Sequence, residues 1–289
     1  MNHLSDFLKD QEEHRGIRLI RNSWIINIEI TNSCSVKCSN CTRASKHINK
    51  PFFSSLEFIE QALNSLKDWP RGIGIIGGEP QDHPQWASIY QILKKFNHKG
   101  GYALFTSREL NPKYRDLFKD YIYTTNHNIK NLHHPLLLTL EDVVPDPKIR
   151  RELIERCWLQ RLWSPSITPK GGFWCEIAGV LDMLWDGPGG YNLDPGWWRR
   201  DSYEDQIQQN CKNCGICIPM PIQTDKEPFE IVTTKYYNLL KKIQSPFLNN
   251  CKIYSEKLSR STIKYRQEKM MNLCYINQRT QEIKGDLYF

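Results

Sequence analysis

The stretch that decides the fold is Trp24-Ile-Ile-Asn-Ile-Glu-Ile-Thr-Asn-Ser-Cys34-Ser-Val-Lys-Cys38-Ser-Asn-Cys41. Its first seven residues are mostly apolar and β-branched, which predicts a buried strand over 24–30. Three thiols then fall within eight residues, so they can face one point only if the backbone curls around it. Three thiolates leave a metal centre with open coordination positions, whereas a structural zinc site closes all four. The spacing therefore favours an iron–sulfur cluster with one iron left free.

Strands and helices alternate in the next part of the chain. The capping pattern Ser54-Ser-Leu-Glu57 predicts that Ser54 caps the first helix, which ends at Trp69. Such alternation predicts βα units and a parallel sheet, with too few units to close an eight-stranded barrel. The predicted fold class is α/β, a partial (β/α)6 TIM-like barrel with a small cysteine-rich C-terminal module and terminal helices. Further strands are expected at 72–76, 102–106, 121–124 and 136–140, and further helices at 84–96, 111–119 and 148–162.

Unusual residues follow the predicted strands at the points where the strands end. The thiols follow the first strand, and Gly77-Gly-Glu-Pro80 follows the second. Thr106-Ser107 follows the third strand, and Asn126-His127 follows the fourth. Because active groups gather at the carboxyl ends of parallel strands, we expect these residues to meet at one edge of the sheet.

The cysteines fall into two close groups. Close clusters in a chain without a visible secretory signal favour metal binding over disulfides. Cys251 and Cys274 stand apart and are expected to be free core thiols. From about residue 157, tryptophans lie among Gly- and Pro-rich turns, which indicates a small second module. This module contains the second group, Cys157, Cys175, Cys211, Cys214 and Cys217. Since Cys-x2-Cys serves zinc as well as iron–sulfur clusters, a four-cysteine zinc ribbon is the alternative.

Four segments are expected: a lead-in at 1–23, a core at 24–150, a cysteine-rich module at 151–225 and a basic helical tail at 226–289. The tail has twelve Lys or Arg against six Asp or Glu, and helices are expected at 229–245 and 250–273. Without a dense basic block, a solvated helical face is favoured over a nucleic-acid site. No secretory signal and no run of roughly 20 apolar residues is visible. We therefore expect a cytoplasmic protein without a membrane partner.

Cys-x3-Cys-x2-Cys after a first strand, with Gly-Gly-Glu-Pro after the second, resembles the radical SAM superfamily over roughly residues 20–145. The resemblance implies that Cys34, Cys38 and Cys41 bind three irons of a [4Fe–4S] cluster, and that S-adenosylmethionine binds the fourth. It also implies contacts to S-adenosylmethionine from Gly77, Gly78, Glu79 and Ser107. The family commonly has an aromatic residue before the third cysteine, where this chain has Asn40.

The second cysteine group resembles the twitch module, a shortened SPASM domain that holds an auxiliary [4Fe–4S] cluster. The implied ligands are Cys157, Cys175, Cys211 and Cys214, with Cys217 able to replace Cys214. The spacing of Cys157 and Cys175 is similar to that of twitch enzymes that oxidise aminocyclitols. The leading hypothesis is therefore a radical SAM oxidoreductase that acts on a sugar- or cyclitol-like small molecule. Its reductant would be a protein such as flavodoxin or ferredoxin.

Two other functions stay open at this point. One is radical modification of a ribosomal peptide, with the basic tail holding an acidic leader. The other is a zinc-stabilised protein that binds nucleic acid through the tail. No catalytic residue is assigned. The candidates for substrate contact are Trp163, Trp185, Trp197, Trp198, Arg199, Arg200, Asp201, Asp182 and Asp186.

Overall fold

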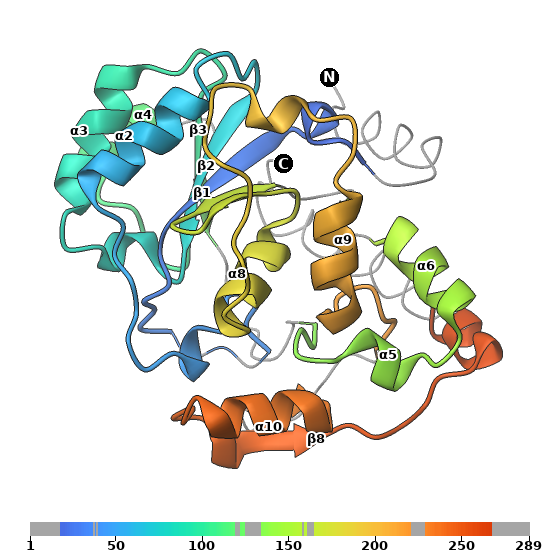
Figure 1. Ribbon diagram of the computed structural model, residues 1–289. Coiled ribbons are helices and arrows are strands. Elements are labelled where there is room, and N and C mark those ends of the chain that lie inside the picture. The colour runs from blue at the N-terminus through green and yellow to red at the C-terminus, as the bar shows by residue number, and fades with distance from the viewer. Residues whose placement is uncertain are drawn as a thin grey trace, which may run out of the picture.

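The computed structural model describes residues 18–267 apart from 37, 39, 119–121, 125–133, 158, 161–164 and 221–228. A six-stranded sheet lies at its centre (Figure 1), in the order β4-β3-β2-β1-β5-β6. Neighbouring strands from β4 to β5 pair in parallel, and β6 is antiparallel to β5. The predicted α/β class with a mostly parallel sheet is therefore confirmed. The strands are β1 Ile25–Thr31, β2 Gly72–Gly77, β3 Tyr102–Thr106, β4 Ile122–Thr124, β5 Ser166–Thr168 and β6 Gly171–Phe173.

The two faces of strand β1 differ in chemistry because its apolar and polar residues alternate. Ile26, Ile28 and Ile30 share one hydrophobic core with the helices α2 (Leu56–Ser65) and α3 (Trp86–Phe96). Asn27 and Glu29 lie on the opposite face, where Asn27 Nδ2 donates to Glu176 Oε2 at 3.0 Å. Glu176 begins α8 (Glu176–Leu184), which lies across the sheet from α2 and α3 (Figure 1). The second face of the sheet therefore carries buried polar side chains.

Helix α2 begins one residue later than its capping pattern predicts. The N-cap is Ser55, whose Oγ accepts a hydrogen bond from the Phe58 N–H at 3.2 Å. The buried Ser54 instead donates from its N–H to Ile30 O at 2.9 Å. The assignment of Ser54 as the N-cap is wrong, because hydrogen bonds to strand β1 fix its backbone outside the helix.

Two predicted elements between 136 and 162 differ in the structure. Residues 136–139 are irregular, and the backbone oxygens of Leu136 and Leu137 accept from Gly215 and Thr233 at 2.9 and 3.1 Å. This apolar run is buried between other segments instead of joining the sheet, so the predicted strand is wrong. The predicted helix at 148–162 is interrupted, since α6 spans Pro147–Glu155 and residues 159–160 are helical again. Shorter helices are α4 Arg115–Phe118, α5 Leu140–Val143 and α9 Glu204–Asn210.

The C-terminal segment contains strands as well as helices. A two-stranded parallel sheet pairs β7 (Glu230–Val232) with β8 (Cys251–Ile253), and α10 (Thr234–Lys242) connects them. The prediction of one helix over 229–245 and another over 250–273 is therefore wrong at both starts. Residues 260–267 are helical, which agrees with the later part of the second prediction. No helix in the part of the chain that the structure describes has the length and apolar character of a membrane crossing.

The cysteine-rich region is joined to the main sheet. Strands β5 and β6 extend the sheet beside β1, and Trp174, Trp197 and Trp198 are buried in the same core as the β1 isoleucines. The predicted boundary between 24–150 and 151–225 is thus crossed by one sheet and one hydrophobic core. The segment boundaries stay predictions. Short 3-10 helices include η2 Ser45–His47, η3 Pro80–Asp82 and η6 Cys211–Asn213.

Candidate active site

The turn after β2 holds the start of the cysteine loop. The N–H groups of Gly78 and Glu79 donate to Thr31 O at 2.8 Å and to Ser33 O at 2.7 Å. A Cβ on Gly78 would lie 2.1 Å from Ser33 O, which is closer than atoms can approach. Glycine is needed here because two backbones pack against each other. The Glu79 N–H thereby fixes Ser33, the residue directly before Cys34, and Gly78 leaves room for this contact.

We predict that Gly78→Ala lowers the free energy of unfolding by about 1–3 kcal/mol, because the added methyl must displace the backbone of Ser33. The matched control is Gly72→Ala at the start of β2, where a Cβ meets its nearest atom at 3.6 Å. Urea denaturation of both variants measures the difference. Equal unfolding midpoints for the two variants would contradict this account of the turn.

Glu79 joins the ends of β2 and β3. Its Oε1 accepts from the Gln81 N–H at 3.1 Å and from Thr106 Oγ1 at 2.7 Å. Its Oε2 accepts from the N–H and the Oγ of Ser107 at 2.9 and 2.6 Å. Four protein donors therefore occupy the buried carboxylate. The structure brings the predicted residues Glu79 and Ser107 together, and it gives Glu79 the role of positioning this edge of the sheet.

Charged residues also hold the loop on the far side of Cys34. The Ser35 N–H donates to Asp82 Oδ2 at 3.1 Å. The other oxygen of Asp82 lies 2.6 Å from Arg108 Nη2, which also donates to Ser35 Oγ. The backbone on both sides of Cys34 is therefore held by residues that follow β2 and β3.

The C-terminal segment holds the second half of the cysteine loop. Asn40 has a positive φ of 49°, a conformation that asparagine tolerates better than most residues. Its Oδ1 accepts from the Ile231 N–H of β7 at 3.1 Å. His47 Nδ1 lies 2.8 Å from Ser245 Oγ, and Lys46 Nζ lies 3.5 Å from Glu230 Oε1. The hydrogen bond between Asn40 and Ile231 gives a physical reason for an asparagine at the position where radical SAM proteins commonly have an aromatic residue.

The thiols of the loop lie within electrostatic reach of one another. Burial raises the pKa of Cys34 to about 11, and the negative charge of Cys41 raises it as well. Burial raises the pKa of Cys38 to about 12, followed by the charges of Cys41 and Cys34. A metal centre is the usual means of holding such thiols as thiolates. A pocket of about 230 Å³ beside the loop is lined by Cys34, Val36, Ser45, Lys46, Ile48, Pro246 and Phe247.

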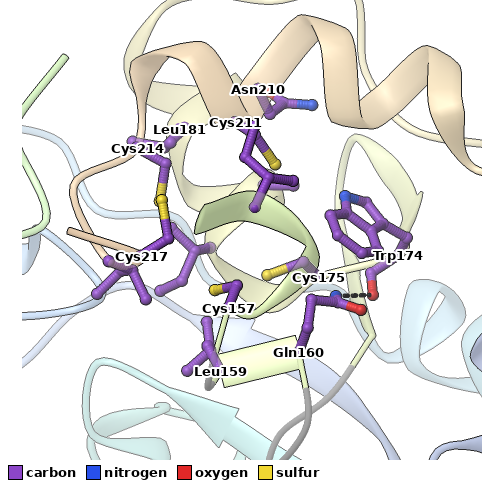
Figure 2. A pocket seen from close by; sticks show the side chains of 14 residues that line it. Cys157, Leu159, Gln160, Trp174, Cys175, Leu181, Asn210, Cys211, Cys214 and Cys217 are labelled. Atoms are coloured by element: carbon purple, nitrogen blue, oxygen red, sulfur yellow. Dashed lines mark hydrogen bonds between the residues drawn. The ribbon is translucent and has the colours of Figure 1, made fainter. Parts of the chain in front are cut away.

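Five cysteines of the second group surround one pocket (Figure 2). Cys175 precedes α8, and Cys157 follows α6. Cys211 begins η6, and Cys214 directly follows it. Burial raises the pKa of Cys175 to about 12, with a further contribution from the charge of Cys157. Burial, followed by the charge of Cys217, raises the pKa of Cys214. The structure thus brings all four predicted ligands and the surplus Cys217 into one group.

In the part of the chain that is described, no three His, Cys, Asp or Glu side chains are placed to hold one metal ion. A zinc site needs each sulfur about 2.3 Å from the same ion, whereas a four-iron cluster carries each thiolate on a separate iron. The five thiols are a donor set that fits an iron–sulfur cluster and a zinc ion alike. A cluster in this pocket would require the side chains to turn outward, because the free volume is about 30 Å³.

A buried ionic group lies between the two cysteine groups. Arg43 Nη2 lies 2.6 Å from Glu176 Oε1, and Arg43 Nη1 lies 3.7 Å from Glu29 Oε2. All three residues are buried. Burial raises the pKa of Glu29 to about 7, Arg43 lowers it and Glu176 raises it. Sequence reasoning missed this group, and its one visible signal was Glu29 within the apolar run of β1.

Most candidates for substrate contact have structural partners. Asp182 is buried, with Oδ2 2.9 Å from Lys170 Nζ and Oδ1 accepting from the Gly189 N–H at 3.1 Å. It therefore holds a turn and is not free to contact a substrate. Trp197 and Trp198 are buried in the hydrophobic core, so their main role is packing. Trp158, Trp163, Asn126-His127 and Cys274 lie outside the described residues.

Two solved structures share part of this fold. BtrN in complex with AdoMet and 2-DOIA superposes with a TM-score of 0.46 and 13% identity, over 71% of this chain and 96% of the BtrN chain. A selenomethionine form of BtrN in an open conformation gives a TM-score of 0.41 and 12% identity, over 66% and 86% of the two chains. No protein-family profile matches the chain, and no curated protein matches its sequence. At these TM-scores and identities, the likeness does not assign the chain to a family.

Proposed function

We propose that this protein is a radical SAM oxidoreductase with two iron–sulfur clusters, acting on a polar sugar- or cyclitol-like molecule. The observation that carries the proposal is the arrangement of eight cysteines in two groups about one parallel sheet. Three follow β1 at the carboxyl end of the sheet, where the turn after β2 fixes the residue before Cys34. Five surround one pocket beside α8. This arrangement fits one site-open cluster and one closed cluster.

Cys34, Cys38 and Cys41 would hold the first [4Fe–4S] cluster, with S-adenosylmethionine at the fourth iron. When bound, these groups would supply a 5′-deoxyadenosyl radical that removes a hydrogen atom from the substrate. Gly77, Gly78, Glu79 and Ser107 form the adjacent edge. Because four donors already occupy the Glu79 carboxylate, we assign Glu79 to positioning Ser107 and the turn. Contact between this edge and S-adenosylmethionine is part of the proposal.

Cys157, Cys175, Cys211 and Cys214 would hold the auxiliary [4Fe–4S] cluster, with Cys217 as the alternative to Cys214. This cluster would supply an acceptor for the electron left on the substrate after hydrogen removal. The pair of Arg43 and Glu176 supports this assignment, because it connects the first cysteine loop with the residue beside Cys175. A substrate bound near Arg43 and Glu176 would lie between the two cysteine groups. A flavodoxin- or ferredoxin-like protein would deliver the first electron.

The proposal is tested by reconstituting the full chain with iron and sulfide under anaerobic conditions. S-adenosylmethionine and dithionite are then added, and 5′-deoxyadenosine and methionine are measured by chromatography. We expect both products, in equal amounts, and an iron–sulfur absorption spectrum. A colourless protein that holds zinc without sulfide and forms neither product would overturn the proposal and favour the zinc-stabilised alternative.

A further inference from the structure

A buried ion pair lies beside the first cysteine loop, where the C-terminal segment contacts it. Lys46 of η2 has its Nζ 3.5 Å from Oε1 of Glu230 in β7, and the two side chains are only 3% and 2% exposed. Among the described residues, neither of these two atoms has a hydrogen-bond partner. The Lys46 Nζ also lies 4.0 Å from the centroid of the Phe247 ring. Lys46 and Glu230 therefore interact through charge and not through an aligned hydrogen bond.

Such a pair contributes little to the stability of a fold. Two charges lose their hydration when they are buried, and their attraction offsets this loss only where further hydrogen bonds complete the pair. Replacing a buried ion pair with apolar side chains of similar volume is often neutral or stabilising. The contact with the Phe247 ring offsets part of the loss at Lys46. The pair is therefore explained more easily by function than by stability.

The ammonium end of the pair faces the cysteine loop. Lys46 lines the pocket of about 230 Å³ together with Cys34, whereas Glu230 does not. Burial, followed by the other two thiols of the loop, raises the pKa of Cys38 to about 12, and Lys46 lowers this pKa more than Glu230 raises it. Burial raises the pKa of Cys251 to about 11, and there the effect of Glu230 exceeds that of Lys46. Because the Coulomb energy falls with distance, the pair has its positive end toward the first cysteine group.

A neighbouring charge affects how readily an iron–sulfur cluster accepts an electron. A cluster bound by three thiolates is already negative, and reduction adds one more negative charge. A positive charge beside the cluster stabilises the reduced form more than the oxidised form, so it raises the reduction potential. A buried ammonium is effective in this respect because salt and water screen it little. In the proposed function, the first cluster must be reduced before S-adenosylmethionine is cleaved.

We propose that Lys46 raises the reduction potential of the first cluster, and that Glu230 holds the ammonium in place and limits its effect. This inference rests on the proposed function, because it needs a cluster bound by Cys34, Cys38 and Cys41. When that cluster takes one electron from dithionite or from a flavodoxin-like protein, the Lys46 ammonium balances part of the added charge. Lys46 acts through the cluster and Glu230 acts through Lys46, so both are positioning residues. The C-terminal segment thereby takes part in the first site through β7.

The test measures the reduction potential of the first cluster in the anaerobically reconstituted full chain. The protein is titrated with dithionite in the presence of redox mediators and without S-adenosylmethionine, and electron paramagnetic resonance follows the reduced cluster. The signal of the first cluster is the one that is absent from the Cys34/Cys38/Cys41→Ala variant. A merely structural role of Lys46 would leave this potential unchanged.

Two variants are expected to move the potential in opposite directions. Lys46→Met removes the ammonium, and we expect the equilibrium constant for reduction to fall at least about tenfold, which is about 59 mV for one electron. Glu230→Gln removes the opposing charge and should raise the equilibrium constant. Lys46→Arg keeps the positive charge and should keep a potential close to that of the wild type.

The matched control is Lys50→Met, because Lys50 is an exposed lysine in the same segment of the chain. Water and salt screen the charge of an exposed side chain, so we expect its removal to change the equilibrium constant by less than about twofold. A shift in Lys50→Met as large as that in Lys46→Met would show that any nearby positive charge has this effect, and would overturn the assignment to Lys46.

An unchanged potential in Lys46→Met, or shifts in the same direction in Lys46→Met and Glu230→Gln, would overturn the inference. If Lys46→Met does not bind iron, Glu230→Gln carries the test, since it keeps the size of the side chain and an unchanged potential there would overturn the inference equally. A wild-type chain that cleaves S-adenosylmethionine at a potential that these variants leave unchanged retains the proposed function and loses only the role of Lys46. A wild-type chain without a first-cluster signal and without cleavage loses the proposed function itself.

Discussion

Replacing Cys34, Cys38 and Cys41 together with alanine is expected to abolish the reductive cleavage of S-adenosylmethionine and to remove about four irons per chain. The reason is that these thiols follow β1 as one group, and no other group in the proposal offers an open iron. Cleavage is measured as 5′-deoxyadenosine formed under dithionite, and iron by a colorimetric assay on the same sample.

The matched control is Cys251→Ala. Cys251 Sγ contacts Phe247 O at 3.6 Å and lines neither cysteine group, so its removal should leave iron content and cleavage unchanged. Circular dichroism of the triple variant shows whether the fold persists. We expect that it does, because none of the three cysteines belongs to the hydrophobic core. Full cleavage activity in the triple variant would refute the assignment of the first group.

Replacing Cys175 and Cys211 with alanine is expected to have a different effect. The iron content should again fall by about four per chain, but formation of 5′-deoxyadenosine should persist. The two thiols influence each other electrostatically and line the same pocket, so both contribute to one centre. Oxidation of the sugar- or cyclitol-like substrate should be lost, because the electron acceptor would be absent.

Single variants of the two remaining candidates complete this prediction. Whichever of Cys214→Ala and Cys217→Ala lowers the iron content identifies the fourth ligand, and the other serves as its control. Both cysteines line the pocket, and the charge of Cys217 acts on Cys214, so the structure places them close together. A Cys175/Cys211→Ala protein with unchanged iron would show that this group holds no cluster.

The first four strands could be predicted from sequence because each is a short apolar run that turn residues or helices bound on both sides. β3 matches its predicted range of 102–106, and β1 and β2 are shifted at their ends by one residue. The residues within and directly beside such a strand determine where it begins and ends. The one-residue error at the start of α2 has the same origin, since Ser54 and Ser55 are equivalent in the capping pattern and only contacts to β1 distinguish them.

Hydrogen bonds between residues far apart in the chain account for the wrong predictions at 136–140 and in the C-terminal segment. The run at 136–140 is apolar enough for a strand, and periodicity alone cannot tell a buried strand from another buried segment. Its backbone is paired with residues far along the chain. The strands β7 and β8 contain three residues each, which is too short for a sequence pattern.

The candidate site also contains both residues that local sequence could predict and residues that only the fold brings together. The thiols and the glycine turn were visible because their chemistry depends on neighbours in sequence. The Asn40 contact to Ile231 spans 191 positions, and the Asn27 contact to Glu176 spans 149. Only the fold brings such residues together, so the buried group around Arg43 could not be predicted.

The most direct test of the central claim is the metal and acid-labile sulfide content of the anaerobically reconstituted wild-type chain. Two [4Fe–4S] clusters predict about eight irons and about eight sulfides per chain, with little zinc. About four irons would remove the auxiliary cluster and the oxidation that depends on it. Stoichiometric zinc without sulfide would contradict the account as a whole.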